Sequence, residues 1–259
     1  MKPNISEFSY GYALTEDLIR WSGARLTAAP IFPSLRDEGK TGGHDLELNF
    51  SEVPLFIQFK LVDHMRQFAR TIEYDHRLYK DSFYRMHLRP LRHSQQHDLL
   101  HDLESKNNIV YYAAPVFHEA LELDKAYVSH EVAARSIFIR PSAIGQLTDQ
   151  GHHHVAFQSR DKAFLLPPRR ETVLESIKDV INRFTKQLQV EPVKTRADDL
   201  QFVTLNQQMR EIVQRHFPEQ DLIGLEMMSN FSPLRKIAYM TRIYFDSELF
   251  LVRPKPLPV

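Results

Sequence analysis

The sequence contains no cysteine among its 259 residues. The protein therefore has no disulfide framework, no thiolate zinc site and no cysteine nucleophile. Charge of one sign is also lacking, because 33 lysines and arginines balance 33 aspartates and glutamates. A neutral total argues against a surface that attracts polyanions over its whole extent, although it permits a local basic cleft.

Long hydrophobic runs are absent as well. No apolar run approaches the ~18–20 residues of a membrane span, and residues 1–7 have no apolar core of the signal-peptide kind. We therefore expect a cytoplasmic protein with no membrane association. Its 42% hydrophobic and 25% charged residues are typical of a globular chain, long enough for one large domain or a domain with a smaller appendage.

The apolar pattern predicts that helices and short strands alternate in the first part of the chain. Helices are expected over 8–21, 94–104 and part of 119–138, and strands over 26–32, 45–50, 54–60, 83–88 and 109–114. The short connection between 45–50 and 54–60 favours a hairpin. The helix over 94–104 favours a parallel crossover between the strands on either side of it. The result is an α/β (α+β) fold, a mixed central sheet flanked by helices.

The remaining residues are expected to form two further regions. Residues 141–168 hold β-like pieces between turns, at 153–158 and 163–166, and should connect a domain over 1–140 to a mainly helical region over 169–259. Helices in that last region are expected over 171–188, 198–217 and 221–245, followed by an extended tail at 254–258.

One stretch combines residue types that suit a hydrolytic metal site. Asp45 lies on one predicted strand, and Gln58 and Lys60 lie on the next. Because side chains alternate along a strand, these three can point to the same side of a sheet. A hard cation takes carboxylate and other oxygen ligands. A phosphodiester under attack also needs a positive group near the attacking water. The stretch therefore indicates a metal-dependent nuclease.

These residues, in this order of elements, resemble the PD-(D/E)XK nuclease superfamily, which has the restriction-endonuclease-like fold. Asp45 matches its acidic strand position, Gln58-Phe59-Lys60 matches its (Glu or Gln)-x-Lys triplet, and Glu16 matches a glutamate often found on the preceding helix. Gly-Gly-x-Asp followed by Gln-x-Lys looks most like the Mrr-type branch. The resemblance covers roughly residues 8–118. It departs from the usual motif because His44 replaces a proline and because Gln58 carries no charge.

The resemblance implies a role for each residue of the motif. Asp45 is the central ligand of Mg²⁺, for which Mn²⁺ can substitute. Gln58 is a second ligand or positions the water, and the Phe59 carbonyl is a further ligand. Lys60 orients the water and stabilises charge on the scissile phosphate. Glu16 is a ligand through water or a structural partner of Lys60.

Other interpretations of these residues stay open. Asp45 and Lys60 could form an ordinary cross-strand ion pair. Glu47, on the same strand face as Asp45, could be an alternative carboxylate. Three further residues could line a nucleic-acid groove near the site or belong to a solvated polar surface: Arg85, Arg89 and Gln96.

The leading hypothesis is a Mg²⁺-dependent nuclease that hydrolyses DNA, in bacterial defence, restriction or repair. The resemblance implies DNA more than RNA. Cutting two strands requires two active sites, so a homodimer is expected. The C-terminal region could bind a regulatory protein. The alternative is a non-catalytic module that keeps the nuclease fold and binds nucleic acid or a protein partner. The neutral net charge and the uncharged Gln58 favour that alternative.

Overall fold

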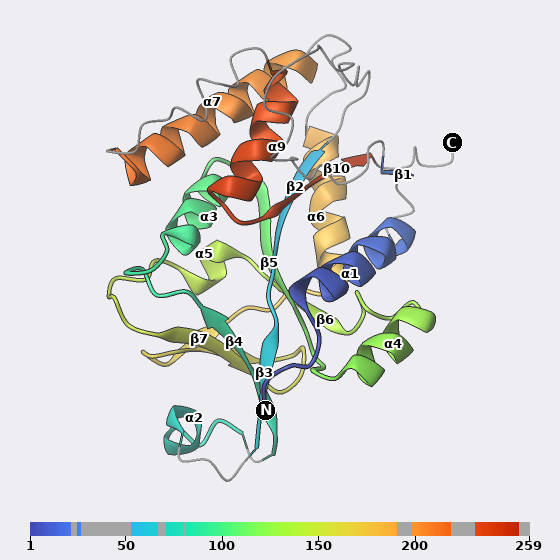
Figure 1. Cartoon of the computed structure of the whole chain (residues 1–259), viewed down its shortest axis with the longest axis vertical. Coiled ribbons are helices and arrows are strands. Elements are labelled where there is room, and N and C mark those ends of the chain that lie inside the picture. Colours follow the sequence, from blue (N-terminus) through green and yellow to red (C-terminus); the bar gives the residue numbers. More distant parts are fainter. Residues whose placement is uncertain are drawn as a thin grey trace.

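The computed structural model describes residues 1–21, 25–26, 53–66, 71–79, 81–190, 198–218 and 231–253. In these ranges the strands form two sheets, and helices pack against them, so the fold belongs to the α+β class (Figure 1). The predicted strand over 45–50, which carries Asp45 and Glu47, lies outside the described residues. So do residues 27–32 of the predicted strand over 26–32 and the tail at 254–258.

The first sheet has β2 (Val53–Phe59) at its centre. Its strands follow the order β1 (Arg25–Leu26), β10 (Glu248–Arg253), β2, β5 (Ile109–Pro115) and β6 (Ser136–Ile139). β2 runs antiparallel to β10 and parallel to β5 (Figure 1). Every residue of β5 is buried, which suits its β-branched and aromatic side chains.

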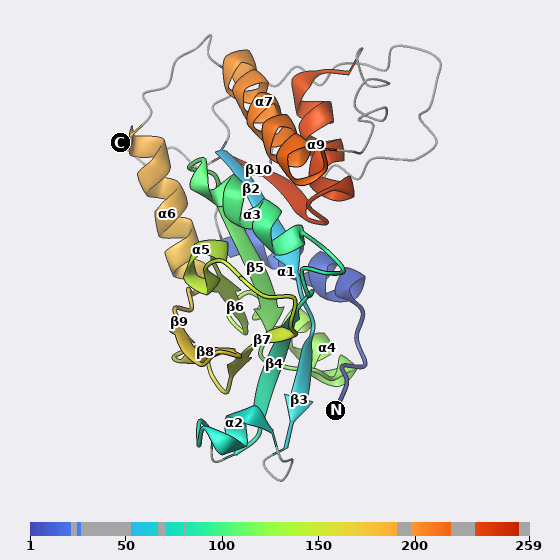
Figure 2. The ribbon, with the colours of Figure 1, turned by 90° about the vertical axis from the view of Figure 1, so that its left-hand side faces the viewer.

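The second sheet is antiparallel throughout. Its strands follow the order β3 (Val62–Met65), β4 (Phe83–Leu88), β7 (His153–Phe157), β8 (Ala163–Leu166) and β9 (Arg170–Thr172). Figure 2 shows β3 below the end of β2, so at this point the chain passes directly from the first sheet into the second. Lys60 and Leu61 alone separate these two strands. The carboxyl end of β2 is therefore the point where the sheets meet.

Helices cover both faces of the first sheet. On one face, α1 (Glu7–Trp21), α4 (Ala120–Val128) and α6 (Ile177–Val190) bury a core that includes Leu14, Tyr111 and Phe184. On the other face, α3 (Gln96–Ser105), α5 (Pro141–Ile144), α7 (Asp198–His216) and α9 (Pro233–Ile243) enclose a core that continues onto the second sheet. The short α2 (Ile72–Asp75) packs on a smaller cluster with Phe83 and Phe164 of the second sheet.

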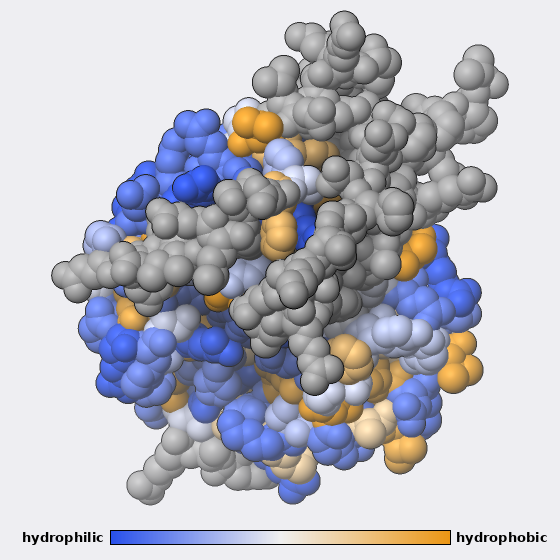
Figure 3. Space-filling model, turned by 45° about the horizontal axis from the view of Figure 1, so that its top comes forward, coloured by the Kyte–Doolittle hydropathy of each residue, from blue (hydrophilic) through white to orange (hydrophobic). Residues whose placement is uncertain are grey.

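The surface is mixed in character. On the face in Figure 3, hydrophobic side chains are scattered among hydrophilic ones over the part that the structure describes. Phe8 and Tyr12 on α1 are among the most exposed large apolar side chains. No helix in the described ranges combines the length and the apolar character that crossing a membrane requires.

Most of the predicted elements within the described ranges are confirmed. These are the helices near 8–21, 94–104 and 198–217 and the strands near 54–60, 83–88, 109–114, 153–158 and 163–166. The helix predicted from residue 171 begins at Ile177 instead, because residues 170–172 extend the second sheet as β9. The strand β10 was not predicted.

Strand pairing differs from the prediction. β4 and β5 do not form a parallel crossover, because β4 belongs to the second sheet and the parallel neighbour of β5 is β2. Over residues 55–57, β10 pairs with one edge of β2 and β5 pairs with the other. The predicted hairpin would instead have had the strand over 45–50 as a neighbour of β2 there. The physical reason is that alternation of side chains identifies the buried face of a strand, but not which strand lies beside it.

Strand pairing also crosses the boundaries predicted at residues 140 and 168. β7 and β8, from the predicted connecting segment, belong with β4 to the second sheet. β10, from the region predicted to be mainly helical, lies between β1 and β2 in the first sheet. The later regions therefore supply strands to the same two sheets as the first 140 residues.

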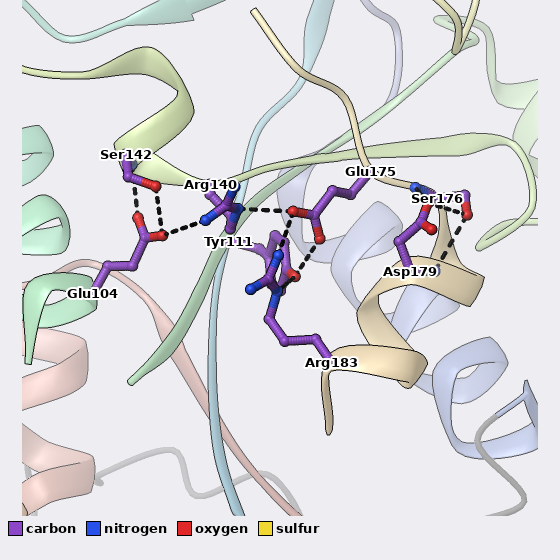
Figure 4. Close-up of polar contacts among 8 residues, drawn as sticks. All are labelled: Glu104, Tyr111, Arg140, Ser142, Glu175, Ser176, Asp179 and Arg183. Atoms are coloured by element: carbon purple, nitrogen blue, oxygen red, sulfur yellow. Dashed lines mark hydrogen bonds and ion pairs between the residues drawn. The ribbon is translucent and has the colours of Figure 1, made fainter. Parts of the chain in front are cut away.

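A polar network fastens α6 to the first sheet (Figure 4). The Oε1 atom of Glu175 accepts hydrogen bonds from Arg140 Nε at 2.7 Å and Arg183 Nη2 at 2.8 Å. Its Oε2 atom accepts one from the Tyr111 hydroxyl at 2.5 Å. The Glu175 backbone also pairs with Phe138 of β6. One carboxylate thus connects β5, β6 and α6.

We expect Glu175→Ala to lower the free energy of unfolding by about 2 kcal/mol, because it leaves the Tyr111 hydroxyl without its acceptor, Arg140 with Glu104 alone and Arg183 with the Tyr111 oxygen alone. Glu171→Ala is the matched control, since Glu171 is exposed and lies 3.6 Å from Lys162. It should change the same quantity by less than about 1 kcal/mol. Urea denaturation measures both. Equal losses in the two variants would contradict a structural role for Glu175.

Candidate functional site

Gln58 and Lys60 come together at the junction of the two sheets. Phe56 belongs to the core that faces α3, α7 and α9, whereas Leu55 and Ile57 belong to the core on the opposite face. Because side chains alternate along β2, Gln58 falls on the same face as Phe56, and Lys60 continues that alternation. The Lys60 backbone N–H still donates to the β5 strand, and its side chain reaches α3.

Lys60 is a buried cation. Its side chain donates from Nζ to Oε1 of Gln96 at 3.1 Å, and the residue is only 6% exposed. Burial lowers the pKa of the Lys60 ammonium from 10.5 to about 8. The charges of Glu7 and Asp246 oppose this fall, and that of Arg89 adds to it. A buried cation with a shifted pKa is a common feature of functional sites.

Gln96 joins Lys60 to the C-terminal part of the chain. Its Nε2 atom donates to Asp246 Oδ2 at 3.0 Å and to the Phe245 carbonyl at 3.3 Å. Asp246 lies between α9 and β10 in the left-handed backbone region, with φ of 46°, and Arg89 lies 3.2 Å from its carboxylate. We call this set the Lys60 cluster; its members are Glu7, Gln58, Lys60, Arg89, Gln96 and Asp246.

The side-chain oxygen of Gln58 accepts no hydrogen bond from the described residues. The residue is 3% exposed, and within the described ranges no hydrogen bond reaches its Oε1 atom. Its Nε2 atom makes only a long contact, 3.5 Å, to the Phe59 carbonyl. Leaving a buried amide oxygen unpaired costs about 1–3 kcal/mol, so such an atom calls for an explanation. An amide oxygen of this kind can bind a water molecule or a hard cation.

Glu16 lies elsewhere, which corrects its predicted role at Lys60. Its Oε1 atom accepts from Arg20 at 2.7 Å, and its Oε2 atom accepts from the Tyr127 hydroxyl of α4. These hydrogen bonds, that of Tyr127 first, lower the pKa of the Glu16 carboxyl. Glu16 therefore links α1 to α4. The carboxylate of α1 whose charge acts on Lys60 is Glu7, in the first turn of the helix.

A glycine brings α1 close to the end of β2. A Cβ atom on Gly11 would lie 2.8 Å from two carbons of the Phe59 ring. Gly11 follows Glu7 by four residues, so the two share one side of the helix. Tyr10 also packs edge-on against Phe59, with ring centroids 6.0 Å apart. The sequence signal for Glu7 was its place at the start of the helix, where acidic residues are favoured.

Of the three predicted nucleic-acid contacts, Arg89 and Gln96 belong to the Lys60 cluster and Arg85 does not. Arg85 Nε donates to Glu73 Oε1 at 2.6 Å, and His154 Nε2 lies 2.6 Å from the same oxygen. Although burial raises the pKa of Glu73, hydrogen bonds from His154 and Arg85 together lower it. Arg85 is therefore the partner of a buried carboxylate. Arg89 follows the last residue of β4, Leu88, and its guanidinium lies 3.2 Å from Asp246 instead.

The oxygen atoms around Lys60 are chemically suited to a hard cation. In the described part of the chain, no three His, Asp or Glu side chains are placed to hold a metal ion. Asp45, the predicted central ligand, lies outside that part. Among the oxygen atoms of described residues, Gln58 Oε1 is buried without a donor, Gln96 Oε1 accepts from Lys60, and Asp246 Oδ2 accepts from Gln96. An amide oxygen that accepts no hydrogen bond from the described residues is a hard ligand, which fits Mg²⁺ and does not suit a softer metal.

Comparisons of the chain with protein-family models, with curated proteins and with solved structures find no match. The Lys60 cluster and the resemblance of its motif are therefore the grounds for assigning a function.

The pKa of Lys60 predicts how Lys60→Met should change stability with pH. Between pH 8 and 10.5 the unfolded chain holds a proton that the folded wild type has released, so wild-type stability rises with pH in that window. Any stability advantage of the variant at pH 7 should therefore shrink by about 2 kcal/mol at pH 10. Urea denaturation at each pH measures the difference. Lys178→Met, at an exposed site on α6, is the control. A difference that does not vary with pH would contradict the shifted pKa.

Proposed function

We propose that the protein is a Mg²⁺-dependent nuclease that hydrolyses phosphodiester bonds of DNA through a restriction-endonuclease-like core. The observation that carries this proposal is that buried Lys60, at the carboxyl end of β2, shares a strand face with Gln58, whose buried amide oxygen accepts no hydrogen bond from the described residues. The order of elements supports it, since the strand bearing the Gln-x-Lys triplet follows α1 and runs parallel to β5, which follows α3.

The residues of the chain divide the work by their chemistry. Gln58 Oε1 and Asp45 would hold the cation, with the Phe59 carbonyl as a further oxygen. Bound Mg²⁺ supplies a water of lowered pKa and neutralises phosphate charge. Lys60, an ammonium at neutral pH, orients the attacking water and stabilises charge on the phosphate. Gln96 fixes the lysine side chain in place by its hydrogen bond.

Glu7 and Asp246 supply negative charge that Gln58 does not. The Gln form of the motif has one carboxylate fewer than the Glu form, which weakens its hold on a cation. Glu7 and Asp246 are carboxylates whose charges raise the pKa of Lys60 against the effect of burial, one from α1 and one from the turn before β10. We infer that these two carboxylates strengthen cation binding at Gln58.

Cleavage of supercoiled plasmid with Mg²⁺ or Mn²⁺ tests the proposal. Lys60→Ala and Asp45→Ala should each lower the cleavage rate by at least about 100-fold, because each removes charge aimed at the reacting phosphate or its metal. Glu16→Ala is the control and should keep its rate, since Glu16 is engaged by Arg20 and Tyr127. Cleavage that survives both substitutions, or no cleavage with any divalent metal, would favour the non-catalytic nuclease-fold module that binds nucleic acid or a protein partner.

The two added carboxylates predict a change in metal affinity. Glu7→Gln and Asp246→Asn should each raise the Mg²⁺ concentration for half-maximal cleavage by about 10-fold, as loss of a supporting ligand does. Calorimetric titration of Mn²⁺ should show the same change without any turnover. Asp63→Asn is the control, because Asp63 pairs with Lys2 and His87 on β3 and β4. Unchanged affinity in both variants would show that neither carboxylate serves the site.

The biological setting follows from the resemblance alone. We propose a role in bacterial defence, restriction or repair, in the cytoplasm, with a homodimer for cutting both strands. A regulatory protein would contact the C-terminal part of the chain. That part reaches the Lys60 cluster through Asp246, so a partner bound there could act directly on the site.

A further inference from the structure

We propose that a cationic pocket on the second sheet, separate from the Lys60 cluster, binds a phosphate of the nucleic-acid backbone. The pocket is a cavity of about 300 Å³ between the turn that follows α2 and the segment around β8. Three cationic side chains line it: Arg77, Lys162 and Arg169. None of its lining residues belongs to the Lys60 cluster. The choice of nucleic acid as the ligand rests on the proposed function.

Two of the cations are held over one aromatic ring. The Lys162 ammonium and the Arg169 guanidinium each lie 5.2 Å from the centre of the Phe164 ring. Cations held over the face of a ring are attracted to its π electrons. Phe164 is only 5% exposed, so its ring forms the floor of the pocket, and the charged groups stand above it. Arg77 adds a third positive charge from the α2 side.

The arginines of the pocket are not neutralised by acidic side chains of the described ranges. Lys162 has Glu171 at 3.6 Å, with both side chains exposed. In the ranges that the structure describes, Arg77 and Arg169 form no ion pair with an acidic side chain. Arg85 on the same sheet shows the opposite case, because Glu73 fully engages it. An unpaired guanidinium offers the planar fork that a phosphate accepts in two hydrogen bonds.

The turn that carries Arg77 is fixed to the sheet before any ligand binds. The Tyr79 hydroxyl donates to the Ala156 carbonyl at 2.7 Å, and its ring stacks on Phe83 with centroids 5.0 Å apart. Arg77 takes a left-handed backbone conformation, with φ of 51°, and its N–H donates to the Tyr74 carbonyl at 2.9 Å. A wall that is already ordered loses less entropy when a ligand binds.

The pocket suits a phosphate that belongs to a polymer. Its cationic residues and Gln158 are all exposed, so a strand can pass over the opening while one phosphate enters. The exposed Gln158 amide provides a polar group for the adjoining sugar, whereas the Ser159 hydroxyl is engaged by Asp161. Because the net charge of the chain is zero, unpaired positive charge at this place is a local feature of the surface.

Binding of a fluorescein-labelled 20-nucleotide DNA strand, followed by anisotropy in EDTA, tests the pocket. The double variant Arg77→Gln/Arg169→Gln should bind at least about 10-fold more weakly, with a salt slope lower by between about one and two. The matched control is Lys178→Gln/Lys186→Gln, which removes two positive charges from exposed sites on α6. It should change affinity by less than about threefold. Tripolyphosphate should compete with the strand on the wild type and not on the pocket variant.

Equal weakening in the two double variants would overturn the proposal, since it would indicate diffuse charge. The proposal would also be overturned if the wild-type protein did not bind the DNA strand, or if it bound only a phosphopeptide. The failures of the two proposals are distinguishable. If the pocket variant binds DNA like the wild type while Lys60→Ala abolishes cleavage, the proposed phosphate pocket is wrong and the proposed nuclease activity is supported. If the pocket variant loses DNA binding and no divalent metal supports cleavage, the proposed nuclease activity is wrong and the proposed phosphate pocket is supported.

Discussion

The hydrogen bond between the buried Lys60 ammonium and Gln96 is the constraint around which the candidate site is arranged. A charged lysine taken out of water is costly unless polar groups surround it. The protein meets this need with Gln96 from α3, with Asp246 from the turn before β10, and with the charge of Glu7 from α1. Three parts of the chain must therefore dock correctly at once for Lys60 to stay protonated at the carboxyl end of β2.

Two polar groups in this protein show the difference between a structural network and a candidate site. Around Glu175, both carboxylate oxygens accept hydrogen bonds, and the two guanidinium charges of Arg140 and Arg183 face two carboxylates, Glu175 and Glu104. That network is complete without a ligand. Around Lys60, the Gln58 amide oxygen is buried and accepts no hydrogen bond from any residue that the structure describes. Since unsatisfied buried acceptors are rare in folded proteins, the incomplete group is the better candidate for binding something from outside the chain.

The C-terminal part of the chain is built into the sheet that carries the motif. β10 pairs with β2 over residues 53–57, and the turn just before β10 provides Asp246. The helices α7 and α9 bury the same core as α3. A change in the packing of this part would therefore move Asp246 and Gln96 relative to Lys60. This gives a physical route by which a partner bound to the C-terminal helices would act on the site.

Local sequence determined the elements and the common face of Gln58 and Lys60, because periodicity and side-chain alternation depend on near neighbours alone. Tertiary structure decided everything that depends on distant pairing. Gln96 lies 36 positions from Lys60, and Asp246 lies 150 positions from Gln96, so no spacing rule could connect them. Glu16 is engaged by Tyr127, 111 positions away, which no spacing rule could indicate either. The backbone edge of a strand offers the same hydrogen bonds to any neighbour, so packing of the whole chain selected β10 and β5 as the partners of β2.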